Sequence, residues 1–81
     1  MKMYCLYDRI SGKYGPLFES ENDATTCRNL KLIQDPLVKA CPGDFDLYSL
    51  GEKDDITGEI ILCKDFVAHF TDIFGGDVNG K

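Results

Sequence analysis

The sequence predicts one α+β domain, in which an antiparallel sheet of two hairpins packs on one helix in the order ββαββ. Two observations carry this prediction. Runs rich in aromatic and aliphatic residues occur in both halves of the chain and are broken by glycine-containing turns, as in β-hairpins. Between them lies one segment with apolar residues at helical spacing. A chain of 81 residues buries only a modest core, which excludes a multidomain enzyme.

The first hairpin is expected within residues 1–19. Met1–Asp8 is rich in Tyr, Met and Leu, which predicts a strand. Arg9–Lys13 is a turn centred on a Ser-Gly pair, and Tyr14–Glu19 is a second short strand. Pro16 has no amide hydrogen for a neighbouring strand, so this second strand is expected at a sheet edge or with a bulge.

The helix is expected from about Asp23 to Gln34. Asn22 or Asp23 can cap its free amide groups, and an acidic first turn suits the helix dipole. Four apolar residues recur at helical spacing on one face: Ala24, Cys27, Leu30 and Ile33. Asp35 and Pro36 are expected to end the helix, because a residue before proline avoids the α region.

The second hairpin follows a connection over Leu37–Gly43, whose end, Cys41–Asp44, is typical of a turn. Phe45–Gly51 and Glu59–Cys63 are its strands, and the polar segment Glu52–Gly58 is its turn. Alternation puts two sets of side chains on opposite faces of the first of these strands: Phe45, Leu47 and Ser49 on one, and Asp46, Tyr48 and Leu50 on the other.

Both a helix and a strand stay open for Lys64–Phe74, and the spacing of its apolar residues favours an amphipathic C-terminal helix. The domain is expected to cover residues 1–74. The glycine-rich residues 75–81 are expected to be a flexible tail. Two short hairpins leave edge strands that invite pairing with a second copy, so a homodimer is expected.

Charge is unevenly divided along the chain. Residues 1–43 carry six basic and five acidic residues, whereas residues 44–81 carry three basic and nine acidic ones. An anionic partner is therefore expected to favour the first half, although the overall charge of −5 excludes binding of nucleic acid by charge alone. The segment Met1–Tyr7 lacks the long apolar stretch of a signal peptide, and no apolar run is long enough to span a membrane. We therefore expect a cytoplasmic protein that does not bind membranes.

No residue pattern indicates an enzyme, a metal site or a cofactor. The only histidine, His69, has no nucleophile and orienting group beside it in the pattern that covalent catalysis needs. The four cysteines are widely spaced, unlike zinc ligands, and are interpreted as small buried apolar side chains: Cys5, Cys27, Cys41 and Cys63. The carboxylates of the second half lack the spacing of a calcium loop. The sequence thus favours a binding protein without cofactor.

Aromatic and basic side chains are interleaved on the predicted first hairpin. Flat rings can stack bases and cations can hold the phosphate backbone, which are the components of a single-stranded nucleic acid site. Packing of the same rings in the core of a small sheet is the simpler alternative. The candidate residues for nucleic acid are Lys2, Tyr4, Tyr7, Arg9, Lys13, Tyr14, Arg28 and Tyr48.

An ordered set of short motifs resembles the small nonstructural protein of gokushoviruses, microviruses with circular single-stranded DNA genomes. The matching segments are Met1–Asp8, Tyr14 with Pro16–Phe18, Asn22–Ala24 with Arg28, Asp35–Pro36, Pro42–Gly51 and Thr57–Ile60. The resemblance implies a DNA-binding protein made in the cytoplasm of the infected bacterium and absent from the virion. It also implies a role in genome replication or in the switch to single-stranded genome synthesis and packaging.

The sequence supports two alternative functions. The first is a non-enzymatic protein that binds single-stranded DNA through the aromatic and basic residues of the first half. The second is an adaptor that binds a phage replication or capsid protein through acidic residues of the second half: Asp44, Asp46, Asp54, Asp55 and Glu59. Rings exposed on an open sheet face would favour a partner, and rings buried under the helix would favour packing alone.

Overall fold

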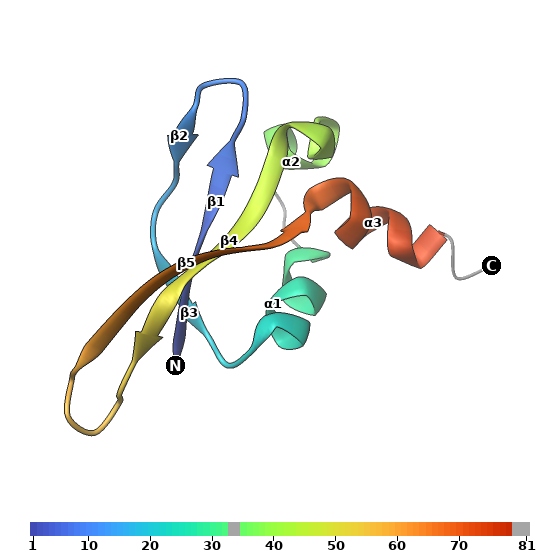
Figure 1. Ribbon diagram of the computed structural model, residues 1–81. Helices are drawn as coiled ribbons and strands as arrows, with labels where there is room; N and C mark the ends of the chain where they lie inside the picture. Colours follow the sequence, from blue (N-terminus) through green and yellow to red (C-terminus); the bar gives the residue numbers. More distant parts are fainter. Residues whose placement is uncertain (33–34, 79–81) are drawn as a thin grey trace.

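The computed structural model describes residues 1–32 and 35–78 (Figure 1). Its elements, in chain order, are β1 (Lys2–Asp8), β2 (Lys13–Tyr14), β3 (Phe18–Ser20), α1 (Asp23–Leu30), α2 (Pro36–Ala40), the 3₁₀ turn η1 (Pro42–Asp44), β4 (Phe45–Lys53), β5 (Ile60–His69) and α3 (Phe70–Val78). The strands form one antiparallel sheet in the order β2-β1-β4-β5, and β3 pairs with the same side of β1 as β2. The predicted α+β class and antiparallel sheet are confirmed. The order ββαββ is only approximate, because the second strand is split and further helices occur.

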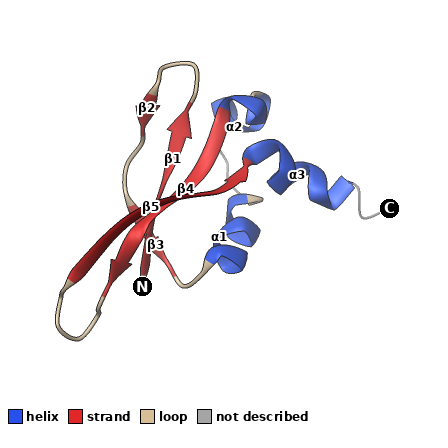
Figure 2. Ribbon diagram, viewed as in Figure 1, coloured by secondary structure: helices blue, strands red, loops and turns tan. Residues whose placement is uncertain are grey.

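The three α-helices lie on one side of the sheet (Figure 2). The buried cluster beneath them draws on β1, β4 and all three helices: Tyr4, Leu30, Val38, Phe45, Leu47, Phe70 and Ile73. Because side chains alternate along a strand, the neighbours of Tyr4 and Leu47 point to the opposite face. The fold therefore has two layers, and the second face of the sheet carries a separate set of side chains.

The first hairpin is built as expected, except at Pro16. Gly12 has φ +71° in the predicted turn, and its amide donates to the Asp8 carbonyl at 2.8 Å. The predicted strand Tyr14–Glu19 divides into β2 and β3 around Pro16, and the Gly15 amide keeps the gap attached through the Leu6 carbonyl at 2.7 Å. The interruption follows from the missing amide hydrogen of proline, at a strand on the edge of the sheet.

The predicted helix over residues 23–34 is too long. Asn22 caps α1 as expected, since its side chain accepts from the Thr25 amide at 2.8 Å, but the helix ends at Leu30. Residues 33 and 34 lie outside the described residues. Asp35 and Pro36, expected to stop one helix, start another. The Asp35 carboxylate caps α2 and Pro36 occupies its first turn, where proline needs no amide hydrogen.

Of the two alternatives for residues 64–74, the structure has a strand in the first part and a helix in the second, so the favoured helix is wrong up to His69, where β5 ends. Phe66 lies opposite Tyr48 and Ala68 lies opposite Leu47 across the ladder with β4. Backbone hydrogen bonds to the free edge of β4 stabilise a strand here, although the spacing of the apolar side chains would also fit a helix. α3 begins at Phe70 and reaches Val78, so the expected flexible tail over 75–81 coincides partly with a helix and partly with residues 79–81, which lie outside the described residues.

A partly buried hydrogen bond fixes α1 on the sheet. Tyr4 is fully buried, and its hydroxyl donates to the Asp23 carboxylate at 2.6 Å. Lys2 donates to the same oxygen at 2.9 Å. These two bonds, the one from Tyr4 first, lower the pKa of Asp23, whereas burial raises the pKa of Tyr4. The start of α1 is thus tied to the middle of β1 by a charge-assisted contact.

The lowered pKa of Asp23 predicts a pH dependence of stability. A carboxyl whose pKa is depressed by folding contributes stability above its unfolded pKa of about 3.9, and this contribution is lost as the pH falls through the lower, folded pKa. We expect Asp23→Asn to reduce the free energy of unfolding by about 0.5–1 kcal/mol near neutral pH, since half of the Asp23 side chain is exposed and screened. The difference should shrink as the pH falls below about 4. Urea unfolding at a series of pH values measures it, with the exposed acid variant Glu21→Gln as control. A difference independent of pH would contradict this assignment.

Gly51 is expected to be the least replaceable glycine of the sheet. Its φ is +137°, and an added Cβ would overlap the carbonyl group of Ile61 on β5. We expect Gly51→Ala to lower the free energy of unfolding by about 2–5 kcal/mol. Gly12→Ala is the matched control, because Gly12 also has positive φ but open space around it, and it should cost about 1 kcal/mol. Equal losses in the two variants, measured by urea unfolding, would show that β4 and β5 are not packed this closely.

Candidate nucleic-acid interface

Four aromatic rings gather on the sheet face that points away from the helices. They come from four strands and form what we call the aromatic face: Tyr7 of β1, Tyr14 of β2, Tyr48 of β4 and Phe66 of β5. Ring centroids are 4.5 Å apart for Tyr7 and Tyr14, 5.5 Å for Tyr14 and Tyr48, and 5.8 Å for Tyr48 and Phe66. Strand register causes this grouping, since Tyr7 lies opposite Tyr14 and Tyr48 lies opposite Phe66.

The two outer rings of the aromatic face are open to solvent. Tyr14 is 44% exposed and Phe66 is 49% exposed, while Tyr7 and Tyr48 between them are half-buried. The contacts of Tyr48 with Tyr14 and Phe66 are edge-on, with interplanar angles of 74° and 79°. The inner rings therefore hold the outer rings in place, and the outer rings keep apolar surface on which a flat ligand can stack.

Lys64 places a positive charge over this face. Its Nζ lies 4.9 Å from the ring centroid of Tyr14 and 5.5 Å from that of Tyr48, within cation–π range. The same atom donates to the Tyr14 hydroxyl at 2.8 Å. That hydrogen bond raises the pKa of Lys64, so the exposed ammonium stays charged at neutral pH. A cation and stacking surfaces thus occur at one place.

A buried carboxylate organises the far end of the face. Asp46 of β4 is buried, and its Oδ1 lies 2.6 Å from Nδ1 of His69. Its Oδ2 lies 3.6 Å from Nε of Arg9, and Nη2 of the same guanidinium group donates to the Gly43 carbonyl. The His69 ring is 4.7 Å from the ring of Phe66. Asp46 therefore holds the side chains of Arg9 and His69 at the end of the aromatic face.

The structure brings together half of the residues that the sequence predicted for nucleic acid. Tyr7, Tyr14 and Tyr48 form most of the aromatic face, and Arg9 lies at its end. The other four belong to the helical side of the sheet: Lys2, Tyr4, Lys13 and Arg28.

Each of these four has a physical reason for its place. Tyr4 is fully buried against α1, so a base cannot stack on it, and Lys2 pairs with Asp23. Lys13 lines a groove on the helical side, and Arg28 is exposed on α1. Aromatic and basic residues that are neighbours in the sequence were assigned to one site, but successive side chains of a strand point to opposite faces of the sheet. These four are therefore removed from the candidate site.

Three residues of the site were missed by the sequence analysis: Lys64, Phe66 and His69. All three lie on the part of β5 that was expected to be helical. The signal that would have found them is the two-residue spacing of Leu62, Lys64 and Phe66, which continues the strand pattern beyond Cys63. Assigning the segment to a helix hid this alternation.

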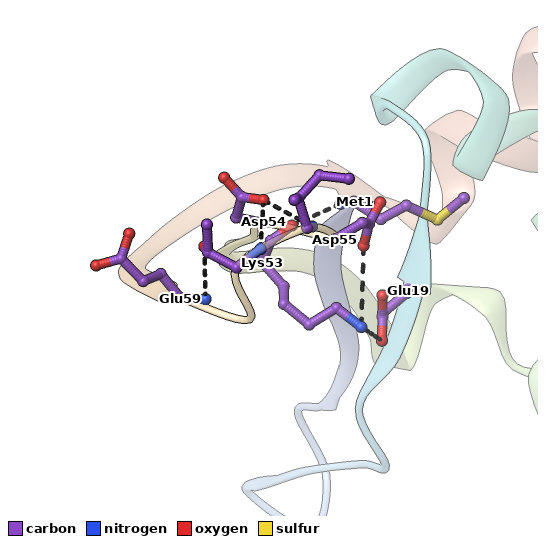
Figure 3. A network of polar contacts seen from close by, with 8 residues as sticks. Met1, Glu19, Lys53, Asp54, Asp55 and Glu59 are labelled. Carbon is purple, nitrogen blue, oxygen red and sulfur yellow. Dashed lines mark hydrogen bonds and ion pairs between the residues drawn. The ribbon is translucent and has the colours of Figure 1, made fainter.

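Three of the five acidic residues proposed for a protein partner bind groups of this chain: Asp46, Asp54 and Asp55. Figure 3 shows the contacts of Asp54 and Asp55. Asp54 accepts from the amides of Ile56 and Thr57 in the β4–β5 turn, and these bonds lower the pKa of Asp54. Asp55 lies 3.3 Å from the amino group of Met1, and Asp46 is occupied as described above. Lys53 joins the same network as Asp55, and its ammonium group pairs with Glu19 at 3.0 Å. Asp54 thus closes the β4–β5 turn, and Asp55 ties this turn to the amino group of Met1.

The helical side carries an apolar groove of about 700 Å³ between the β2–β3 segment and helices α1 and α2. Among the described residues, no group of three or more His, Cys, Asp or Glu side chains is placed to hold a metal ion. Within the same residues, no helix is long and apolar enough to cross a membrane.

Of the cysteines, Cys5 is buried as expected, but Cys63 is exposed, so the prediction of four buried thiols is wrong.

Comparison with known proteins gives one match. The family model described as "Phage ORF5 protein" matches residues 1–73. No curated protein and no solved structure matches the chain. The match covers all the strands and reaches into α3, so it includes every residue of the aromatic face.

Proposed function

Since the chain belongs to the phage ORF5 protein family, it is a phage protein, and we propose that it is a nonstructural one that binds single-stranded DNA. The proposed site is the aromatic face with Lys64. The protein acts without catalysis, in genome replication or in the switch to single-stranded genome synthesis, inside the infected bacterial host.

The observation that carries this proposal is the exposure of Tyr14 and Phe66 on one face, where the ammonium group of Lys64 lies over the Tyr14 ring. Bases of an unpaired strand can stack on such rings, at about 1–3 kcal/mol per base, and a cation can hold the adjoining phosphate. Bases inside a duplex are already stacked and paired, so the site favours single strands.

The charge of the chain supports stacking as the main source of affinity. With a net charge of −5, general attraction to phosphate is absent, and only local cations remain. Binding should therefore depend weakly on salt. The alternative, an adaptor that uses acidic residues to bind a replication or capsid protein, has less support because Asp46, Asp54 and Asp55 already bind groups within the chain.

Removing either outer ring should weaken binding of a single strand. We expect Tyr14→Ala and Phe66→Ala each to raise the Kd by about 5- to 150-fold, which corresponds to losing about 1–3 kcal/mol of stacking. Fluorescence anisotropy of a labelled single-stranded oligonucleotide measures this change, with duplex of the same sequence for comparison. Arg28→Ala is the control, since it removes an exposed cation from α1 on the other side of the sheet. If Arg28→Ala weakened binding as much as Phe66→Ala, the aromatic face would not be the site.

The salt dependence of binding separates the contribution of Lys64 to phosphate binding from the contribution of the rings to base stacking. We expect Lys64→Gln to lower the slope of log K against log salt by about 0.7, the value for one phosphate contact on a single strand. Phe66→Ala should weaken binding but leave this slope unchanged, because a neutral ring releases no counterion. An unchanged slope in Lys64→Gln would remove this residue from phosphate binding.

A further inference from the structure

The outer edge of β5 is unpaired. In the part of the chain that the structure describes, β5 pairs with β4 on one side, and no strand lies on its other side. The strand is ten residues long, and its backbone groups along that edge are available to another strand. Natural proteins usually shorten, cover or interrupt such an edge, because it is a template for pairing.

The first part of β5 is apolar and exposed on both of its faces. Ile60, Ile61 and Leu62 are 54%, 73% and 80% exposed, and successive residues point to opposite faces of the sheet. This part belongs to the β4–β5 hairpin, which projects away from the three helices (Figure 1). A run of large apolar side chains on an open edge, clear of the rest of the fold, marks a contact surface.

We propose that two copies of the chain pair antiparallel through the outer edges of β5, around a two-fold axis beside Cys63. The occupant of the edge is thus a second copy. The two sheets become one continuous sheet, and the interface is self-complementary, as a two-fold contact requires.

The position of the axis follows from charge. A two-fold axis places one residue opposite its own copy, and like charges directly opposite each other are destabilising. This argues against an axis at Lys64 or Asp65. An axis at Leu62 would put Glu59 opposite Asp65. An axis at Phe66 would place Leu62 of one copy opposite Phe70 of the other, which cannot pair as a strand because β5 has ended and α3 begins there.

An axis at Cys63 avoids these conflicts. It places Ile60 opposite Phe66 of the second copy, Ile61 opposite Asp65 and Leu62 opposite Lys64, so no like charges meet. It also uses the part of β5 that projects beyond the helices. Axes nearer the β4–β5 turn would pair fewer residues of β5.

Pairing in this register extends the aromatic face. Lys64 and Phe66 contact that face directly, and alternation puts Ile60 and Leu62 on the same side. The two aromatic faces would therefore lie side by side, with apolar side chains of both copies between them. Self-association itself does not depend on DNA binding and is tested without DNA.

The test compares two substitutions of exposed residues in the same hairpin. Sedimentation equilibrium of the full chain should show a dimer for the unchanged protein. Leu62→Lys places a lysine opposite Lys64 of the second copy and should give a monomer. Ile56→Lys adds the same charge in the turn, at a residue that is 92% exposed and outside the paired segment, and should stay dimeric. Circular dichroism should show unchanged folds, since neither side chain is buried.

Cross-linking tests the register. Opposite Cα atoms in an antiparallel pair are about 4.5–5.5 Å apart, within the range that a disulfide can bridge. Copper(II)–phenanthroline, as oxidant of the two thiols, should therefore join two chains through Cys63. Cys63→Ser should abolish this product and leave the dimer intact.

Three results would overturn the proposed pairing or its register. A monomeric unchanged protein, or a Leu62→Lys variant that stays dimeric, would overturn pairing through β5. A dimer that forms no disulfide at Cys63 would overturn the proposed register. Because none of these measurements includes DNA, they can fail while the DNA-binding titrations succeed, and the reverse also holds.

Discussion

Pairing of β1 with β4 is the interaction on which the rest of the structure depends. The two strands come from opposite halves of the chain and are aligned over the full length of β1. On one side of this ladder, Tyr4 and Leu47 enter the core beneath the helices. On the other side, the same alternation brings Tyr7 and Tyr48 together, with ring centroids 6.1 Å apart. One ladder therefore creates both the core and the aromatic face, so the site cannot be separated from the stability of the sheet.

The strands β1 and β4 could be predicted from the sequence, because they depend on local patterns, but their pairing with each other could not. Alternation in β4, the Ser-Gly turn after β1 and the Asn22 cap are properties of neighbouring residues, and all occur in the structure. The part of β5 after Cys63 could not be predicted in the same way, since Phe66 and Phe70 fit one helical face by spacing alone. In the structure they lie on different sides of the sheet, Phe66 against Tyr48 and Phe70 in the core. A partner distant in sequence, the edge of β4, decides this.

The location of charge was equally hard to predict. The basic first half of the chain indicated an anion site there, but Lys2, Lys13 and Arg28 lie on the helical side. The cation that does lie over the aromatic face, Lys64, comes from the acidic half. Counting charge along a chain ignores the face to which each side chain points, whereas binding depends on charge within a Debye length of the ligand. The family match shows that the chain belongs to a phage protein family and names no ligand.

The central claim is that single-stranded DNA lies across the aromatic face and Lys64. The most direct test is a two-dimensional NMR titration of the ¹⁵N-labelled protein with a single-stranded oligonucleotide, supplemented by observation of the aromatic side chains. The account predicts that the largest shifts occur at Tyr14, Tyr48, Lys64 and Phe66, and that α1 and α2 are unaffected. Shifts concentrated on α1, α2 and the apolar groove, or the absence of shifts, would contradict it.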